Sequence, residues 1–170
     1  MKTLKIFRGG STKNFTCTNG DTYDSSATLE DQFKFGPVGL WFSEYVNTDS
    51  TLGYKGGKLA KGEYYGIVGY RQPKEGEAQG KRVIKLFRPV GAMPTSYDQL
   101  TVEMMTLPSE IPNPNHSNLP VIQYCQVHDG GQSWDFSHGC LTIYRNSPHN
   151  DWERLMELLA DNEIIKINLQ

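Results

Sequence analysis

The sequence lacks any long run of apolar residues. A helix that crosses a bilayer needs about 20 consecutive apolar residues, and the longest apolar stretches here, such as the one around residues 119–121, are far shorter. Residues 1–8 carry charges and lack the apolar centre of a secretory signal peptide. We therefore expect neither membrane insertion nor a signal peptide in this chain.

An excess of charge is also missing, and cysteine is scarce. The 17 Lys and Arg residues are balanced by 19 Asp and Glu residues, which gives a formal net charge of −2. Electrostatic binding to nucleic acid requires a basic surface, so no nucleic-acid partner is expected. The three cysteines, Cys17, Cys125 and Cys140, form an odd set. At least one thiol is then free within the chain, which argues against a disulfide scaffold.

Short segments rich in β-branched and aromatic residues dominate the chain. No internal repeat or change of composition divides the 170 residues, so residues 1–170 are expected to form a single domain. Turn residues separate the segments, which predicts a mainly β fold. The predicted strands are residues 4–7, 39–42, 64–70, 82–87, 120–127, 141–144 and 164–169.

One convincing α-helix is predicted near the C-terminus. Residues 147–151 offer capping candidates, and Trp152, Leu155, Met156 and Leu159 then recur at helical spacing. A second, short helix is predicted around residues 97–105. The Pro- and Asn-rich residues 106–118 are predicted to form a long surface loop.

Residues 125–141 hold two of the three cysteines and two of the four histidines. A nucleophilic thiol needs an imidazole that lowers its pKa and N–H groups that stabilise an oxyanion. If the strand that ends at His128 and the strand that follows Cys140 are neighbours, the loop between them lets Cys140 face His128. Gly139 allows a close approach of the backbone, and Ser137 and His138 are candidates to hydrogen-bond the loop or the reacting groups.

The run Ser137-His138-Gly139-Cys140-Leu141, preceded by His128, resembles the signature of the L,D-transpeptidase (YkuD-like) catalytic domain family. That family has a His, a loop, and then Ser/Thr-His-Gly-Cys followed by an apolar residue. Residues 58–65 are also similar to the Pro-x-Gly-x-aromatic start of a strand in this family. The resemblance covers residue 58 to the end of the strand after Cys140. It implies a β-sandwich-like catalytic fold, here with one C-terminal α-helix.

The resemblance implies a role for each residue of the motif. Cys140 would attack the carbonyl between an L-centre and a D-amino acid of a peptidoglycan stem peptide, and His128 would act as base and then as acid. The carbonyl or the side chain of Asp129 would orient His128, and the N–H groups of Gly139 and Cys140 would form the oxyanion hole. Expected substrate-binding residues are Gly130, Tyr124, Trp134 and Phe136. Transfer to an amine would give a transpeptidase, and transfer to water a carboxypeptidase.

Three positions differ from the family pattern. The interval from His128 to Cys140 is shorter than usual, Thr142 replaces the usual Arg or Asn, and Ala60 replaces the usual Pro. The expected partners are peptidoglycan stem peptides or muropeptides. The resemblance implies that the protein acts in the periplasm or cell envelope if it is exported, and otherwise in the cytoplasm.

Two alternatives remain open. The first is a non-catalytic binding or structural module of phage or secretion-system origin that keeps the fold. The second is a zinc site formed by Cys125, His128, His138 and Cys140. Zinc is disfavoured because the second pair has one intervening residue and because Cys125 and His128 would point to opposite faces of a straight strand. No cofactor is expected, since residues 56–58 lack the phosphate-loop pattern.

Overall fold

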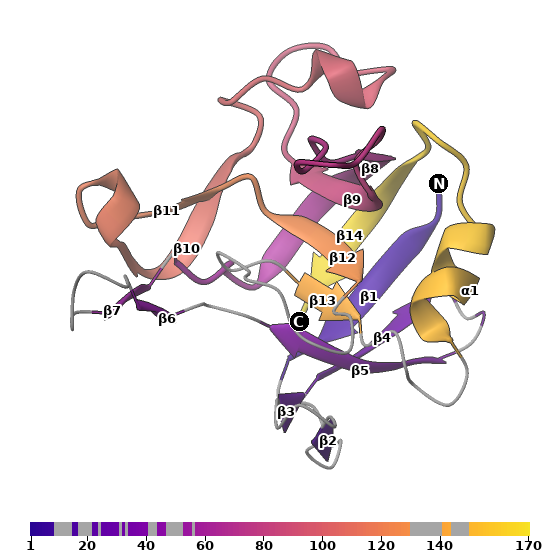
Figure 1. The fold of residues 1–170 in the computed structure, drawn as a ribbon, viewed down its shortest axis with the longest axis horizontal. Helices are drawn as coiled ribbons and strands as arrows, with labels where there is room; N and C mark the ends of the chain where they lie inside the picture. The colour runs from indigo at the N-terminus through magenta and orange to yellow at the C-terminus, as the bar shows by residue number, and fades with distance from the viewer. Residues whose placement is uncertain are drawn as a thin grey trace.

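The computed structural model describes residues 1–8, 15–16, 22–23, 25–30, 32, 34–40, 44–46, 53–55, 57–129, 141–143 and 150–170. Eight strands within them form one sheet that closes on itself into a barrel (Figure 1). Around the barrel the order is β1 (Thr3–Phe7), β14 (Ile164–Leu169), β8 (Gly62–Tyr70), β9 (Arg82–Phe87), β12 (Gln126–Asp129), β13 (Leu141–Ile143), β5 (Lys34–Leu40) and β4 (Ser25–Leu29).

Three two-stranded pairs and three short helical segments complete the described structure. The pairs are β2 (Phe15–Thr16) with β3 (Thr22–Tyr23), β6 (Glu44–Val46) with β7 (Gly53–Lys55), and β10 (Thr106–Asn113) with β11 (Leu119–Gln123). The helical segments are η1 (Tyr97–Gln99), η2 (Pro114–His116) and α1 (Asp151–Glu157). The β10–β11 pair projects from one side of the barrel, and α1 lies on the opposite side (Figure 1).

The predicted mainly β fold is confirmed, with α1 as the one α-helix among the described residues. The finer prediction of a sandwich-like L,D-transpeptidase fold is not confirmed, because β1 pairs with both β14 and β4 and so joins the two ends of one sheet. Closure of the sheet removes its free edges, which are otherwise open to pairing with other chains.

Alternation along the strands fills the barrel with apolar side chains. In β9, Ile84 and Leu86 are buried inside the barrel, while Lys85 between them lies on the outer face. The same two-residue period puts Val127 of β12 inside. This regular pattern is why the predicted strands at residues 4–7, 64–70, 82–87, 141–144 and 164–169 are confirmed to within a few residues. The prediction for residues 39–42 overlaps the end of β5, and its last two residues lie outside the described ones.

The strand predicted over residues 120–127 is wrong as a single unit. It is two strands, β11 and β12, because Tyr124 adopts a left-handed backbone conformation with φ of 56° and turns the chain between them. β11 joins the projecting pair, while β12 enters the barrel between β9 and β13.

The surface loop predicted over residues 106–118 is also wrong. Residues 106–113 form β10, paired antiparallel with β11, and η2 follows. Proline lacks the N–H needed for a central strand, but an edge strand with one partner tolerates it. Pro108 lies opposite Val121, and toward residues 59–60 it uses only its carbonyl, which accepts from the Ala60 N–H at 2.9 Å and needs no N–H from proline.

The predicted C-terminal helix is confirmed as α1. Its residues Trp152 and Leu155 are buried and belong to the same apolar core as the barrel interior. The short helix predicted at residues 97–105 is reduced to the single turn η1, capped by the Ser96 hydroxyl. Residues of this segment instead cover a second, smaller cluster on the outer face of the sheet, centred on Ile67, Phe87 and Met104. None of the helices in the described part of the chain has the length and apolar character needed to span a bilayer.

Candidate active site

His128 lies on the outer face of the barrel, on a strand held from both sides. β12 pairs antiparallel with β9 and parallel with β13. Since Val127 points into the core, the neighbouring His128 points outward and is half-buried. The two strands that flank the Cys140 segment are therefore neighbours in the sheet, which is the arrangement that a His128–Cys140 pair requires.

The imidazole of His128 is oriented by the backbone of the next residue. Its Nδ1 lies 2.9 Å from the carbonyl oxygen of Asp129. Because a carbonyl oxygen only accepts hydrogen bonds, this contact requires a proton on Nδ1. In the neutral ring the lone pair is then on Nε2, the atom that would take a proton from a thiol. Of the two Asp129 groups considered from sequence, the backbone carbonyl is the one observed next to Nδ1.

Strand β13 brings Thr142 opposite His128. The two residues are Cα partners in the parallel ladder, and Leu141 and Ile143 on either side belong to the core. Because Leu141 and Ile143 point into the core, Thr142 between them points to the outer face, as His128 does. It is nevertheless buried there. A buried, neutral side chain thus occupies the position where the L,D-transpeptidase pattern has a charged or amide residue.

Most of the predicted motif falls outside the described residues. These positions are Gly130, Trp134, Phe136, Ser137, His138, Gly139 and Cys140. Of the predicted site residues, the structure describes His128 and Asp129, which it brings into contact, and Tyr124. Tyr124 is exposed in the turn before β12 and lines a pocket next to His128.

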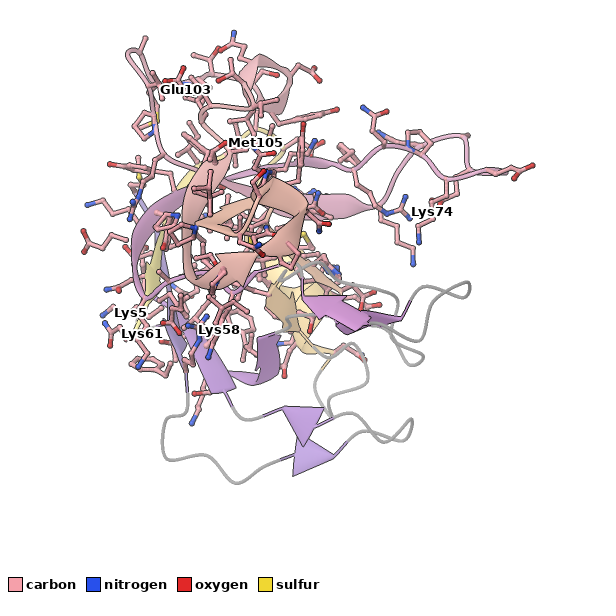
Figure 2. The ribbon with its side chains drawn as sticks, turned by 90° about the vertical axis from the view of Figure 1, so that its left-hand side faces the viewer. Lys5, Lys58, Lys61, Lys74, Glu103 and Met105 are labelled. Carbon is pink, nitrogen blue, oxygen red and sulfur yellow. The ribbon has the colours of Figure 1, made fainter. Side chains whose placement is uncertain are left out.

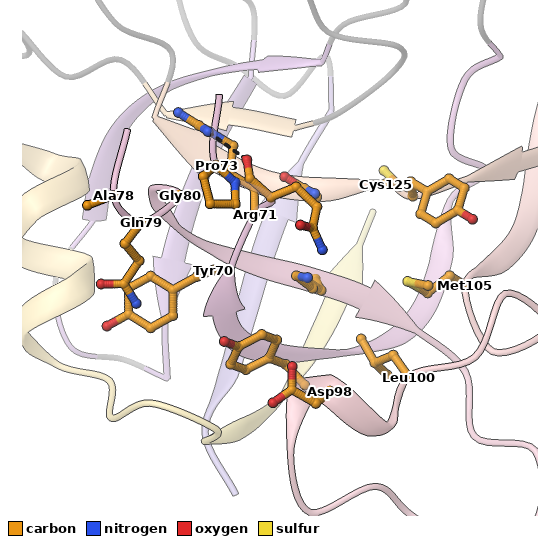
Figure 3. A pocket seen from close by; sticks show the side chains of 15 residues that line it. Tyr70, Arg71, Pro73, Ala78, Gln79, Gly80, Asp98, Leu100, Met105 and Cys125 are labelled. Atoms are coloured by element: carbon orange, nitrogen blue, oxygen red, sulfur yellow. Dashed lines mark hydrogen bonds between the residues drawn. The ribbon is translucent and has the colours of Figure 1, made fainter. Parts of the chain in front are cut away.

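This pocket, with a volume of about 480 Å³, opens on the outer face of β8, β9 and the start of β12 (Figure 3). One wall is the loop after β8, and another is the segment that contains Tyr97, Leu100 and Met105. The residues that line it are Tyr70, Arg71, Gln72, Pro73, Ala78, Gln79, Gly80, Lys85, Tyr97, Asp98, Leu100, Met105, Tyr124, Cys125 and Gln126.

The pocket shares both its face and one strand with His128. Gln126 lines the pocket and pairs with Lys85 across the β9–β12 ladder. His128 follows Gln126 by two positions on the same face, which is about 6.6 to 6.8 Å along a strand. A ligand extended along β12 would therefore reach from the pocket to His128.

The electrostatics of the pocket depend on Lys85. Partial burial lowers the pKa of its ammonium group, and the negative charge of Asp98 partly offsets this. The ammonium nitrogen lies 5.0 Å from the centre of the Tyr97 ring. Sequence analysis missed Lys85, because an outward-pointing lysine in a strand is usually a solvated surface residue. No signal in the sequence indicates that the segment around Tyr97 folds over it.

The zinc alternative loses its first ligand pair. Cys125 is a buried cysteine that belongs to the core cluster with Val127, whereas His128 points to the outer face. The two side chains thus point to opposite faces, as the strand period indicates. His138 and Cys140, the second pair, lie outside the described residues.

A group of lysines lies away from this site. In the view of Figure 2, Lys5, Lys58 and Lys61 fall on one side of the barrel. Lys58 Nζ is 3.5 Å from Oε2 of Glu110, and the other oxygen of that carboxylate, Oε1, lies 2.9 Å from Arg8. This charge is therefore partly neutralised and does not mark an anion site.

No protein-family model matches the sequence, and neither a curated protein nor a solved structure gives a match. Function is therefore inferred from the residues themselves.

Proposed function

We propose that the protein is a cysteine-dependent acyl transferase that acts on peptidoglycan stem peptides, as an L,D-transpeptidase, an L,D-carboxypeptidase or both. Cys140 is the nucleophile in this proposal, and His128 is the base. Gly139 and Cys140 supply the N–H groups that stabilise the oxyanion. The fold proposed for it is a divergent, closed version of the L,D-transpeptidase sheet.

The observation that carries the proposal is the parallel pairing of β12 with β13. It puts His128 opposite Thr142 on the outer face, with Nδ1 of the imidazole held by the Asp129 carbonyl. Cys140 directly precedes β13 in the sequence, and the proposal is that its thiol pairs with the His128 imidazole.

The proposed reaction has two steps. In the first, Nε2 of His128 takes the Cys140 proton, and the thiolate attacks the carbonyl carbon between the L-centre and the D-amino acid. The C–N bond breaks, the D-amino acid leaves with the proton from His128, and a thioester remains. In the second step, water or an acceptor amine gives up a proton to His128 and attacks the thioester, which releases the Cys140 thiol.

The experiment is to incubate the protein with disaccharide-tetrapeptide muropeptides and to follow the products by mass spectrometry. We expect loss of the terminal D-amino acid or formation of dimers. Both products should disappear in Cys140→Ala and persist in Cys17→Ala, which removes a thiol outside the motif. Product formation that is unchanged in Cys140→Ala would exclude this mechanism.

The second candidate is a non-catalytic binding module, which Thr142 favours. The buried threonine opposite His128 carries no charge, where the L,D-transpeptidase pattern has an Arg or Asn. A binding module predicts that muropeptides bind with equal affinity to the wild type and to Cys140→Ala and that neither protein forms a product.

A further inference from the structure

Lys85 is a half-buried cation inside a pocket. Its ammonium group forms no hydrogen bond or ion pair with the described residues, and it interacts with the Tyr97 ring and with the negative charge of Asp98. Partial burial removes water from an ammonium group and makes its charged form less favourable. An anion that entered the pocket would restore the interactions that the ammonium has lost.

Two arginines near the pocket are already paired. Arg71 makes two hydrogen bonds to the Glu77 carboxylate, at 3.0 and 3.1 Å. Arg82 contacts Asp161 at 2.8 Å and donates to two carbonyl oxygens at the end of α1. Of the two cations that line the pocket, Arg71 and Lys85, Lys85 is therefore the one available to a ligand.

The remaining pocket surface suits a peptide. The side chains of Gln72, Gln79 and Gln126 offer amide donors and acceptors, and the rings of Tyr70 and Tyr97 offer flat apolar surface. Figure 3 shows Gln79 and Tyr70 toward one end of the lining and Met105 and Cys125 toward the other. This combination of one cation, amides and aromatic rings fits a polar chain that carries a carboxylate.

We propose that this pocket binds a free carboxylate of an extended peptide, with the Lys85 ammonium as its counter-ion. The inference rests on the proposed function for the rest of the ligand, which is the stem peptide bound along β12 with its scissile carbonyl at His128. Gln126 links the two ends, because it faces Lys85 across the ladder and precedes His128 on the same face. The carboxylate bound by Lys85 is thus a free one, distinct from the amide carbonyl that Cys140 attacks.

The test measures the affinity of Cys140→Ala protein for two tetrapeptides by calorimetry. Both have the sequence of a stem peptide. One has free carboxylates, and in the other every carboxylate is an amide. We expect the acid peptide to bind at least about tenfold more tightly, as for a hydrogen bond between charged groups. Lys85→Met should remove this preference and leave the affinity for the amide peptide unchanged.

Two further variants keep the test decisive. Lys85→Arg preserves the charge and should retain a preference for the acid peptide, and Lys85→Gln replaces Lys85→Met if the latter does not fold. Lys81→Met is the matched control, because Lys81 is exposed just before β9 and lies outside the pocket lining. The preference of Lys81→Met for the acid peptide should equal that of the protein in which both lysines are unchanged.

The outcomes separate the two proposals. Failure of the acid peptide to bind, equal affinity for both peptides, or an acid preference that survives in Lys85→Met would overturn the role of Lys85. If muropeptides are also turned over, the proposed function stands without it. A preference that Lys85→Met abolishes, in a protein with no turnover, supports the carboxylate pocket and rejects the enzyme.

Discussion

Gly69 leaves room for the Tyr97 ring that forms one wall of the pocket. A Cβ atom at Gly69 would lie 2.4 Å from Cγ of Tyr97 and 2.7 Å from its Cβ and Cδ1. Ring rotation cannot relieve these contacts because Cβ of Tyr97 is itself too close. Gly69→Ala must therefore displace the backbone at Tyr97, where the N–H donates to Asn162 at 3.0 Å.

We expect Gly69→Ala to lower the free energy of unfolding by about 1 to 3 kcal/mol, the usual cost of overpacking. For a chain of this length that corresponds to a melting temperature lower by roughly 2 to 12 °C. The measurement is thermal and urea unfolding followed by circular dichroism. It is combined with NMR of the Tyr97 ring and of the Lys85 side chain, whose ammonium lies 5.0 Å from the ring centre.

Gly66→Ala is the matched control. Its added Cβ would lie 2.5 Å from Cγ2 of Ile84, inside the barrel and away from the pocket. Both substitutions should lower stability, but only Gly69→Ala should shift the Tyr97 and Lys85 resonances. Unchanged stability and unchanged Tyr97 signals in Gly69→Ala would refute the close packing of Tyr97 on β8.

Two further predictions concern the barrel. Partial burial opposes ionisation of Glu110, but the positive charges of Arg8 and Lys58, with a hydrogen bond from the Lys61 N–H, leave its pKa lowered. Glu110→Gln should therefore lower the free energy of unfolding by at most about 1 kcal/mol. This loss is present above pH 4.5 and vanishes as the pH falls through the lowered native pKa of Glu110. A loss that does not change with pH in urea titrations would contradict this. Leu155→Ala should lower the free energy of unfolding by about 2 to 5 kcal/mol, because this side chain is fully buried between α1 and the barrel. A decrease below about 1 kcal/mol would mean that α1 does not pack on the barrel in solution.

Much of the strand pattern could be predicted, because alternation is a local property. β9 and β14 have the predicted bounds, since their residues alternate between the core and the outer face. The break at Tyr124 could not be predicted, because nothing about a tyrosine favours a φ of 56°. The prolines of β10 led to the wrong prediction of a loop. A proline destabilises a strand only where its missing N–H would have bonded to a neighbouring strand, and the sequence does not show which neighbours β10 has.

The candidate site was predicted only where it is local in sequence. His128 and Asp129 are adjacent in the chain, and their contact through the carbonyl is one of the two arrangements that the resemblance implied. The pocket depends on long-range contacts. It forms because Tyr97 packs on Gly69 of β8 and because Gln126 pairs with Lys85 of β9. No residue type in those segments signals that they meet.

The rate at which each cysteine reacts with iodoacetamide tests the pairing of thiol and imidazole most directly. At pH 7 a thiol of ordinary pKa is only a few per cent thiolate, and an adjacent imidazole raises this fraction at least about tenfold. Mass spectrometry should therefore find that Cys140 is alkylated at least about ten times faster than Cys17 and that His128→Ala removes the difference. Equal, slow labelling of both thiols, or fast labelling of Cys140 that persists without the imidazole, would contradict the account.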